Sequence, residues 1–113
     1  MVTLYHNPRC SKSRETLALL QAHGIAPEVV HYLATPPDRD TLQILLRKLG
    51  MRSARQLMRT KEDLYHALQL ESASESALLD TLVAHPKLLE RPIVINGDRA
   101  RLGRPPEAVL AIL

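Results

Sequence analysis

The feature that most constrains the fold is a strand–helix–strand pattern within the first 33 residues. Residues 2–5 form a short apolar run with β-branched side chains, which is typical of a buried strand. Apolar side chains at helical spacing follow from Ser11 and stop at Gly24, a residue type that often ends helices. Residues 28–33 form a second strand-like run. Because strands joined by a helical crossover run parallel, the sequence predicts a βαβ unit at its start.

The middle of the chain predicts helices only. The leucines at positions 42, 45, 46 and 49 follow the i, i+3, i+4, i+7 spacing of a buried helix face, and Gly50 ends this pattern. Further helices are expected over residues 53–59, 61–68 and 74–84. The middle is therefore a helical insert between two parts that contain strands.

The end of the chain predicts a β-hairpin and a last helix. Residues 92–95 are apolar, and the Asn96-Gly97 pair that follows is a strong hairpin signal because it accepts positive φ angles. Residues 99–102 would form the antiparallel return strand, and a helix over residues 105–113 would begin with proline. The order βαβ, helical insert, ββα belongs to the α/β class and is thioredoxin-like. We expect one domain over residues 1–113, with the insert at about 38–86.

The composition excludes several classes of function. The 15 Lys and Arg against 12 Asp and Glu leave a net charge of +3, which is too small and too scattered to indicate nucleic-acid binding by itself, so we expect no nucleic acid as a partner. The charge does suit a small anion as the ligand. A single cysteine excludes an internal disulfide, whereas small secreted proteins usually carry several. With no signal peptide or membrane-length apolar run, we expect a cytoplasmic protein that binds no membrane. One Cys and five scattered His predict no metal site, and we expect no bound cofactor.

The single cysteine, Cys10, lies between the first strand and the first helix. Unsatisfied N–H groups and the helix dipole favour a thiolate there, and the thiolate is the nucleophile. Arg9, Lys12 and Arg14 add positive charge, and His6 would add more if protonated. A helix start also binds anions, so an oxyanion could rest on the N–H groups of residues 11–14, within reach of the sulfur.

The segment from Cys10 to Ser13 reads C-x-x-S. Ser13 stands where a C-x-x-C motif would place a resolving thiol, so a disulfide cycle must borrow a thiol from another molecule. We place Ser13 with the substrate-binding residues. The alternative interpretation is an inert buried cysteine, which is common for a lone Cys. For His6, a structural role such as a hydrogen bond to the loop backbone fits as well as a chemical one.

Four segments of this sequence carry a family resemblance. They are H-N-P-R-C-S-K-S-R at 6–14, R-Q-L-M-R at 55–59, E-R-P-I-V-I at 90–95 and R-L-G-R-P-P-E at 101–107. In this order and at this spacing the chain resembles the glutaredoxin-coupled arsenate reductases, the ArsC family, and within it the shorter, housekeeping branch. The resemblance runs nearly end to end. It implies the thioredoxin-like fold already expected from the pattern of strands and helices.

The resemblance also implies a mechanism. Cys10 attacks arsenate and forms a thiolate–arsenate ester. Glutathione, the co-substrate, reduces the arsenic and leaves a mixed disulfide on Cys10, and glutaredoxin then removes the glutathione. The family's active-site histidine corresponds to His6, and its three substrate-binding arginines correspond to Arg59, Arg91 and Arg104.

The chemistry of arsenate independently calls for arginine. The planar guanidinium presents paired donors to an anion with several charged oxygens, and positive charge stabilises the thiolate and the ester. Exposure is the usual state of arginine, and we expect Arg55 and Arg101 to be solvated surface residues. The choice between Arg55 and Arg59 as the substrate ligand stays open. The Arg91-Pro92 bond is expected to be cis, as the resemblance implies for the proline that faces the active cysteine.

Two other functions fit parts of the sequence. A regulator similar to the Spx type shares this fold and binds RNA polymerase, but such proteins commonly carry C-x-x-C and lack the last substrate arginine. A general glutathione-dependent thiol oxidoreductase would need Cys10 but not three anion-binding arginines. Replacing Arg91 or Arg104 should therefore spare such an enzyme and cripple an oxyanion reductase.

Overall fold

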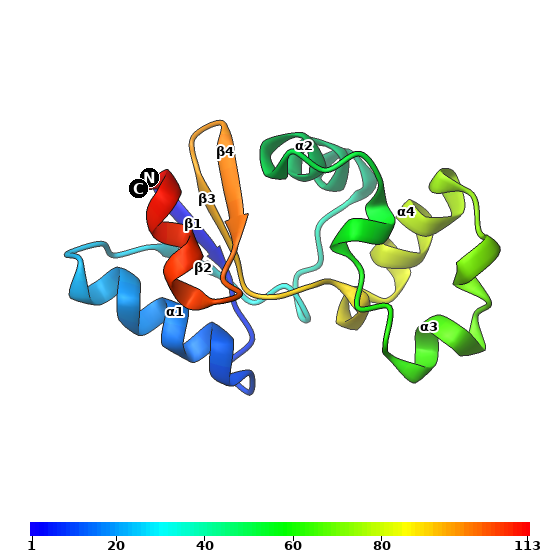
Figure 1. Cartoon of the computed structure of the whole chain (residues 1–113), viewed down its shortest axis with the longest axis horizontal. Helices are drawn as coiled ribbons and strands as arrows, with labels where there is room; N and C mark the ends of the chain where they lie inside the picture. Colours follow the sequence, from blue (N-terminus) through cyan, green and yellow to red (C-terminus); the bar gives the residue numbers. More distant parts are fainter. The chain divides into compact units, whose positions relative to one another are not determined.

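The computed structural model describes residues 1–113 and divides into two compact units (Figure 1). The first unit joins the two ends of the chain, Met1–Thr35 and Arg91–Leu113. The second unit is the continuous segment Pro36–Glu90 between them. No helix in either unit has the length and apolar character needed to cross a membrane.

The first unit is built on a four-stranded sheet in the order β2-β1-β3-β4. Its strands are β1 (Val2–Tyr5), β2 (Glu28–Val30), β3 (Ile93–Asn96) and β4 (Arg99–Leu102). Strand β1 pairs parallel with β2 and antiparallel with β3, and β3 pairs antiparallel with β4. The predicted parallel βαβ start and the predicted hairpin are confirmed, and the fold is α/β and thioredoxin-like.

Two helices pack together on this sheet, α1 (Ser11–Ala22) and the 3₁₀ helix η4 (Pro106–Ile112) (Figure 1). The core between helices and sheet consists of aliphatic side chains from β1, α1, β3 and η4: Leu4, Leu20, Val94, Val109 and Ile112. Leu4 and Val94 are register partners, so they lie on one face of the sheet. This core fixes the start of α1 relative to the turn between β4 and η4.

Strand β2 is shorter than the predicted run over residues 28–33. Its only neighbour is β1, whose last residue, Tyr5, pairs with Val30. No strand extends beyond Tyr5 to bind the next residues, and the backbone turns instead. The N–H groups of Ala34 and Thr35 donate to the carbonyl of His31.

The second unit contains the helices α2 (Arg39–Leu49), α3 (Asp63–Ala67) and α4 (Glu75–Ala84). Three short 3₁₀ helices lie between and after them: η1 (Ala54–Leu57), η2 (Leu70–Ser72) and η3 (Pro86–Leu88). Helix α2 begins at the Asp38 cap and ends at Gly50 in the left-handed region, as its leucine pattern predicts.

The helices expected over residues 53–59 and 61–68 are both shorter in the structure. Ser53 and Gln56 form a capping box that starts η1. The chain becomes extended at Met58, because Met58 forms a β-bridge with Leu89. A tertiary contact of this kind lies beyond the reach of local periodicity.

Candidate active site

The loop that precedes α1 is held closed by its own backbone and by one arginine. The N–H of Cys10 donates to the carbonyl of Asn7 at 2.9 Å, and the N–H of Arg9 donates to the side-chain oxygen of Asn7 at 3.0 Å. Arg14 Nη1 donates to the carbonyl of Pro8 at 2.9 Å. Cys10 is thereby fixed as the N-cap residue of α1, the position predicted for it.

The sulfur of Cys10 lies in surroundings that favour the thiolate. The residue is 8% exposed. Burial acts to raise the pKa of the thiol, but the backbone N–H groups of Ser13 and Lys12 and the charges of Arg91 and Arg104 outweigh it. The pKa of Cys10 therefore lies below its ordinary value, and the helix start supplies part of the cause.

Arg104 reaches this sulfur from the other end of the chain. Its Nη2 lies 3.9 Å from Cys10 Sγ, and its Nε donates to the carbonyl of Arg91 at 2.7 Å. The segments around Arg91 and Arg104 run side by side, because the N–H of Gly103 donates to the carbonyl of Pro92 at 2.9 Å. The Arg91-Pro92 peptide bond is cis, which confirms that prediction, and the Arg104-Pro105 bond is also cis.

Gly103 permits this close approach. A Cβ atom there would lie 2.5 Å from Thr16 Oγ1 and 2.6 Å from Pro92 Cγ, both far inside van der Waals contact. Thr16 cannot simply turn away, because its hydroxyl donates to the carbonyl of Lys12 at 2.8 Å. Helix α1 and Pro92 thus pack so closely against residue 103 that this position has no room for a side chain.

Arg91 carries an unsatisfied polar atom. Its Nε is buried and has no hydrogen-bond partner. Buried polar groups are almost always hydrogen-bonded, so such an atom calls for an explanation. The charge of Arg91 acts on Cys10. An oxyanion bound by Arg91 next to the thiolate would supply the hydrogen-bond acceptor that this Nε lacks.

His6 and Ser13 form a buried pair behind the loop. His6 Nδ1 and Ser13 Oγ lie 2.6 Å apart, and the N–H of Asn7 donates to the same oxygen at 3.0 Å. Ser13 is fully buried, so it presents its backbone N–H to the sulfur while its hydroxyl binds the loop. Burial, His31 and Arg14 lower the pKa of His6, which favours its neutral form.

The model of the ArsC family matches residues 5–112 of this chain. The chain belongs to the ArsC family. An arsenate reductase of Haemophilus influenzae is 52% identical over 99% of this chain and 98% of its own length. An uncharacterized protein of Escherichia coli, YfgD, is 61% identical over 99% of this chain and 96% of its own length. The structure of an arsenate reductase of Vibrio cholerae superposes with a TM-score of 0.97 at 54% identity, covering 99% of this chain and 97% of that one.

Two further arginines of this ArsC-family chain lie in the second unit. Arg59 Nη1 forms an ion pair with Glu62 Oε1 at 2.6 Å. Arg55 was expected to be a solvated surface residue, and this is wrong. Its Nε donates to Tyr65 Oη at 3.1 Å, and its Nη2 donates to the carbonyls of Leu70 and Ala73 at 3.0 and 3.2 Å. Arg101 is exposed, as predicted.

Sequence reasoning identified Cys10, Arg91 and Arg104, which the structure brings together in the first unit. It missed Gly103 and the carbonyl of Arg91, which place the Arg104 guanidinium. The signal for Gly103 was available, since a glycine just before Arg-Pro-Pro at a strand end suggests a close backbone approach. The chain contains no cluster of three or more His, Cys, Asp or Glu side chains that could hold a metal ion.

Proposed function

We propose that this chain is a glutathione- and glutaredoxin-dependent arsenate reductase, an oxidoreductase of the cytoplasm. Membership of the ArsC family and the names of its relatives in Haemophilus influenzae and Vibrio cholerae support the substrate. The observation that carries the proposal is the guanidinium of Arg104 at 3.9 Å from a sulfur whose pKa is lowered. A nucleophile and an anion-binding cation thus meet at one point.

The first chemical step is attack of the Cys10 thiolate on the arsenic atom. An S–As bond forms, and the hydroxyl group of arsenate takes up one proton from solvent and leaves as water, so the arsenic stays As(V). Arg91 and Arg104 bind the remaining oxygens, and the unsatisfied Nε of Arg91 is one donor. Positive charge stabilises both the thiolate and the ester that forms from it.

The second step requires a thiol from outside, because Cys10 is the only cysteine of the chain. The sulfur of glutathione attacks the Cys10 sulfur, and the S–As bond breaks. Its electron pair stays on arsenic, which becomes As(III), and the two sulfurs form a mixed disulfide. Glutaredoxin then takes the glutathione from Cys10, arsenite departs, and the thiolate is restored.

The remaining site residues have supporting roles in this proposal. Ser13 offers its backbone N–H to the sulfur and, when substrate is bound, to an arsenate oxygen. His6, neutral and bonded to Ser13, keeps that turn of the helix in place. Arg59 is the third substrate arginine by resemblance to the family. Arg55, held by Tyr65 and two carbonyls, is not assigned to substrate.

The proposal is tested by arsenate-dependent consumption of NADPH in the presence of glutathione, glutaredoxin and glutathione reductase. The wild-type chain should consume NADPH only when arsenate is added, and the Cys10→Ser variant should not consume it above background. A wild-type rate that stays at background would contradict the proposal.

A second assay separates arsenate reduction from general disulfide reduction. Arg91→Gln should lose most arsenate turnover but keep its reaction with an uncharged disulfide such as 2-hydroxyethyl disulfide. Both reactions must be measured at a pH at which the thiols of wild type and variant are ionised, so that only oxyanion binding differs. Equal losses in the two reactions would favour a general thiol oxidoreductase.

A further inference from the structure

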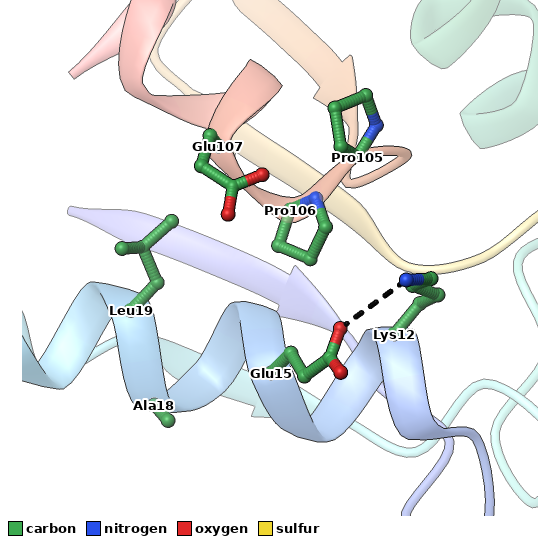
Figure 2. Close-up of a pocket in the computed structure, with 7 residues that line it drawn as sticks. All are labelled: Lys12, Glu15, Ala18, Leu19, Pro105, Pro106 and Glu107. Carbon is green, nitrogen blue, oxygen red and sulfur yellow. Dashed lines mark ion pairs between the residues drawn. The ribbon is translucent and has the colours of Figure 1, made fainter.

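A groove lies between helix α1 and the start of η4 (Figure 2). Its volume is about 530 Å³, within the range typical of small-molecule sites. One wall is the exposed face of α1, with Lys12, Glu15 and Leu19. The other wall is Pro105-Pro106-Glu107, so both walls belong to the first unit.

The groove holds charges of both signs, and one of them is unpaired. Lys12 Nζ forms an ion pair with Glu15 Oε2 at 3.5 Å (Figure 2). Glu107, on the facing wall, has no ion-pair partner. One ammonium therefore faces two carboxylates, and a ligand that brings its own ammonium would balance the charge.

The chain itself connects this groove to the reactive sulfur. Lys12 is two residues beyond Cys10, in the first turn of α1. Pro105 directly follows Arg104, whose guanidinium lies 3.9 Å from the sulfur. The two walls of the groove are thus continuous with the two segments that meet at the sulfur, the start of α1 and the turn before η4.

We propose that this groove binds the γ-glutamyl end of glutathione, with its α-ammonium at Glu107 and its α-carboxylate at Lys12. The inference rests on the proposed function, in which an external thiol must discharge Cys10. It adds the place where glutathione binds and the side chains that recognise it. Lys12 exchanges part of its ion pair with Glu15 for the ligand carboxylate, and Glu15 becomes a second acceptor for the ammonium.

The apolar lining supports a ligand with this shape. Pro105, Pro106 and Leu19 present carbon atoms to the groove beside the charged groups. The γ-glutamyl group has two methylenes between its charged end and the peptide that carries the sulfur. Both charges of this end are on one carbon, so it can contact Lys12 and Glu107 at the same time while its methylenes pack against the prolines.

The test uses thiol–disulfide exchange on the full chain without arsenate. The Cys10 thiolate attacks one sulfur of glutathione disulfide, the S–S bond breaks, and one glutathione leaves as a thiolate while the other stays on Cys10. The rate is followed by mass spectrometry of quenched samples. The comparison substrate is the disulfide of glutaryl-cysteinyl-glycine, which lacks only the ammonium of glutathione.

The wild-type chain should react with glutathione disulfide roughly three to five times faster than with the glutaryl disulfide, the effect of one exposed ion pair. Long-range electrostatics predict the opposite order, because the glutaryl disulfide is more negative and the protein carries a net charge of +3. The sign of the difference therefore separates recognition of the ammonium from general attraction of an anion.

The decisive variant is Glu107→Gln, which removes the acceptor for the ammonium. Its rate with glutathione disulfide should fall to that with the glutaryl disulfide, although the protein has become more positive. The matched control is Glu28→Gln, which removes an exposed carboxylate of β2 in the same unit and should leave the preference intact. The alkylation rate of Cys10 by iodoacetamide should be the same in all three proteins.

The groove assignment is overturned if wild type does not prefer glutathione disulfide, or if Glu107→Gln keeps the preference. It is also overturned if Glu107→Gln slows only the reaction with glutaredoxin, since the groove would then bind a protein. Because arsenate is absent, these outcomes do not depend on arsenate reduction. A chain with this preference but without arsenate turnover would refute the proposed function alone.

Discussion

The guanidinium of Arg104 lies 3.9 Å from the sulfur of Cys10, although 94 positions separate the two residues in the sequence. The carbonyl of Arg91 fixes this geometry by accepting a hydrogen bond from Arg104 Nε at 2.7 Å. The surroundings of the reactive sulfur therefore depend on three pieces of chain: the start of α1, Arg91 before β3, and the turn after β4.

The first prediction concerns the ionisation of Cys10. Replacing Arg104 with glutamine removes one of the charges that hold the pKa of the thiol below its ordinary value, so the pKa should rise. The rate of iodoacetamide alkylation against pH measures it. The control variant Arg101→Gln also removes one positive charge, at an exposed position on β4, and should leave the alkylation rate against pH unchanged. A thiol that titrates alike in wild type and Arg104→Gln would contradict the assigned contact.

The second prediction concerns Gly103. An alanine Cβ there would meet Thr16 Oγ1 and Pro92 Cγ at 2.5 and 2.6 Å, so Gly103→Ala should lower the free energy of unfolding by about 1 to 3 kcal/mol. It should also slow alkylation of Cys10, because Arg104 is displaced.

The comparison variant for this test is Gly97→Ala in the hairpin turn. Its Cβ would meet no atom within 4 Å, and only the positive φ of 64° opposes it. It should cost about 1 to 2 kcal/mol and leave the reactivity of Cys10 unchanged. Equal effects of the two variants on alkylation would refute the role of Gly103. Urea denaturation supplies the stabilities.

The third prediction separates Arg55 from Arg59. Arg55 binds a buried tyrosine hydroxyl and two carbonyls, so Arg55→Ala should destabilise the protein by about 2 to 3 kcal/mol. Arg59 pairs with a partly exposed glutamate, and Arg59→Ala should cost less than about 1 kcal/mol while arsenate turnover falls. Urea denaturation and the coupled assay give both readouts. A stable Arg55→Ala variant without arsenate turnover would reverse the assignment.

The fourth prediction follows from the lowered pKa of His6. Burial first, then His31 and Arg14, favour the neutral form in the folded state. The stability gained is complete above the pKa of an unfolded histidine, about 6.5, and is lost as the pH falls through the lower folded pKa. When the pH is lowered from about 7.5 to about 5, the free energy of unfolding should thus decrease more for wild type than for His6→Gln. Denaturation curves at both pH values check this, and equal decreases would contradict it.

Local signals predicted much of the fold because they act within a few residues. The glycine at position 24 after the first helix, the leucine spacing of α2 and the Asn96-Gly97 turn each specify their own stretch of backbone. The length of β2 was overestimated because it depends on where β1 ends. The role of Arg55 was misjudged for the same kind of reason, since its partners Tyr65, Leu70 and Ala73 are brought together only by the folded second unit.

In the candidate site, too, features set by neighbouring residues could be predicted from sequence, whereas features set by distant residues could not. The helix start at Cys10 could be placed from sequence, and so could the effect of its N–H groups on the thiol. The contact with Arg104 could be expected only from the family resemblance, because no local pattern links positions 10 and 104. The neutral state of His6 required knowledge of its burial and of its neighbours His31 and Arg14.

The central claim is that the ionised sulfur of Cys10 and the guanidinium groups beside it bind arsenate together. Protection of Cys10 from iodoacetamide by rising arsenate tests it most directly, with chloride at equal ionic strength as the control. We expect the alkylation rate of wild type to fall to a plateau as arsenate saturates the site, and that of Arg91→Gln to fall far less. An alkylation rate that does not depend on arsenate, or equal protection of the two proteins, would contradict the account.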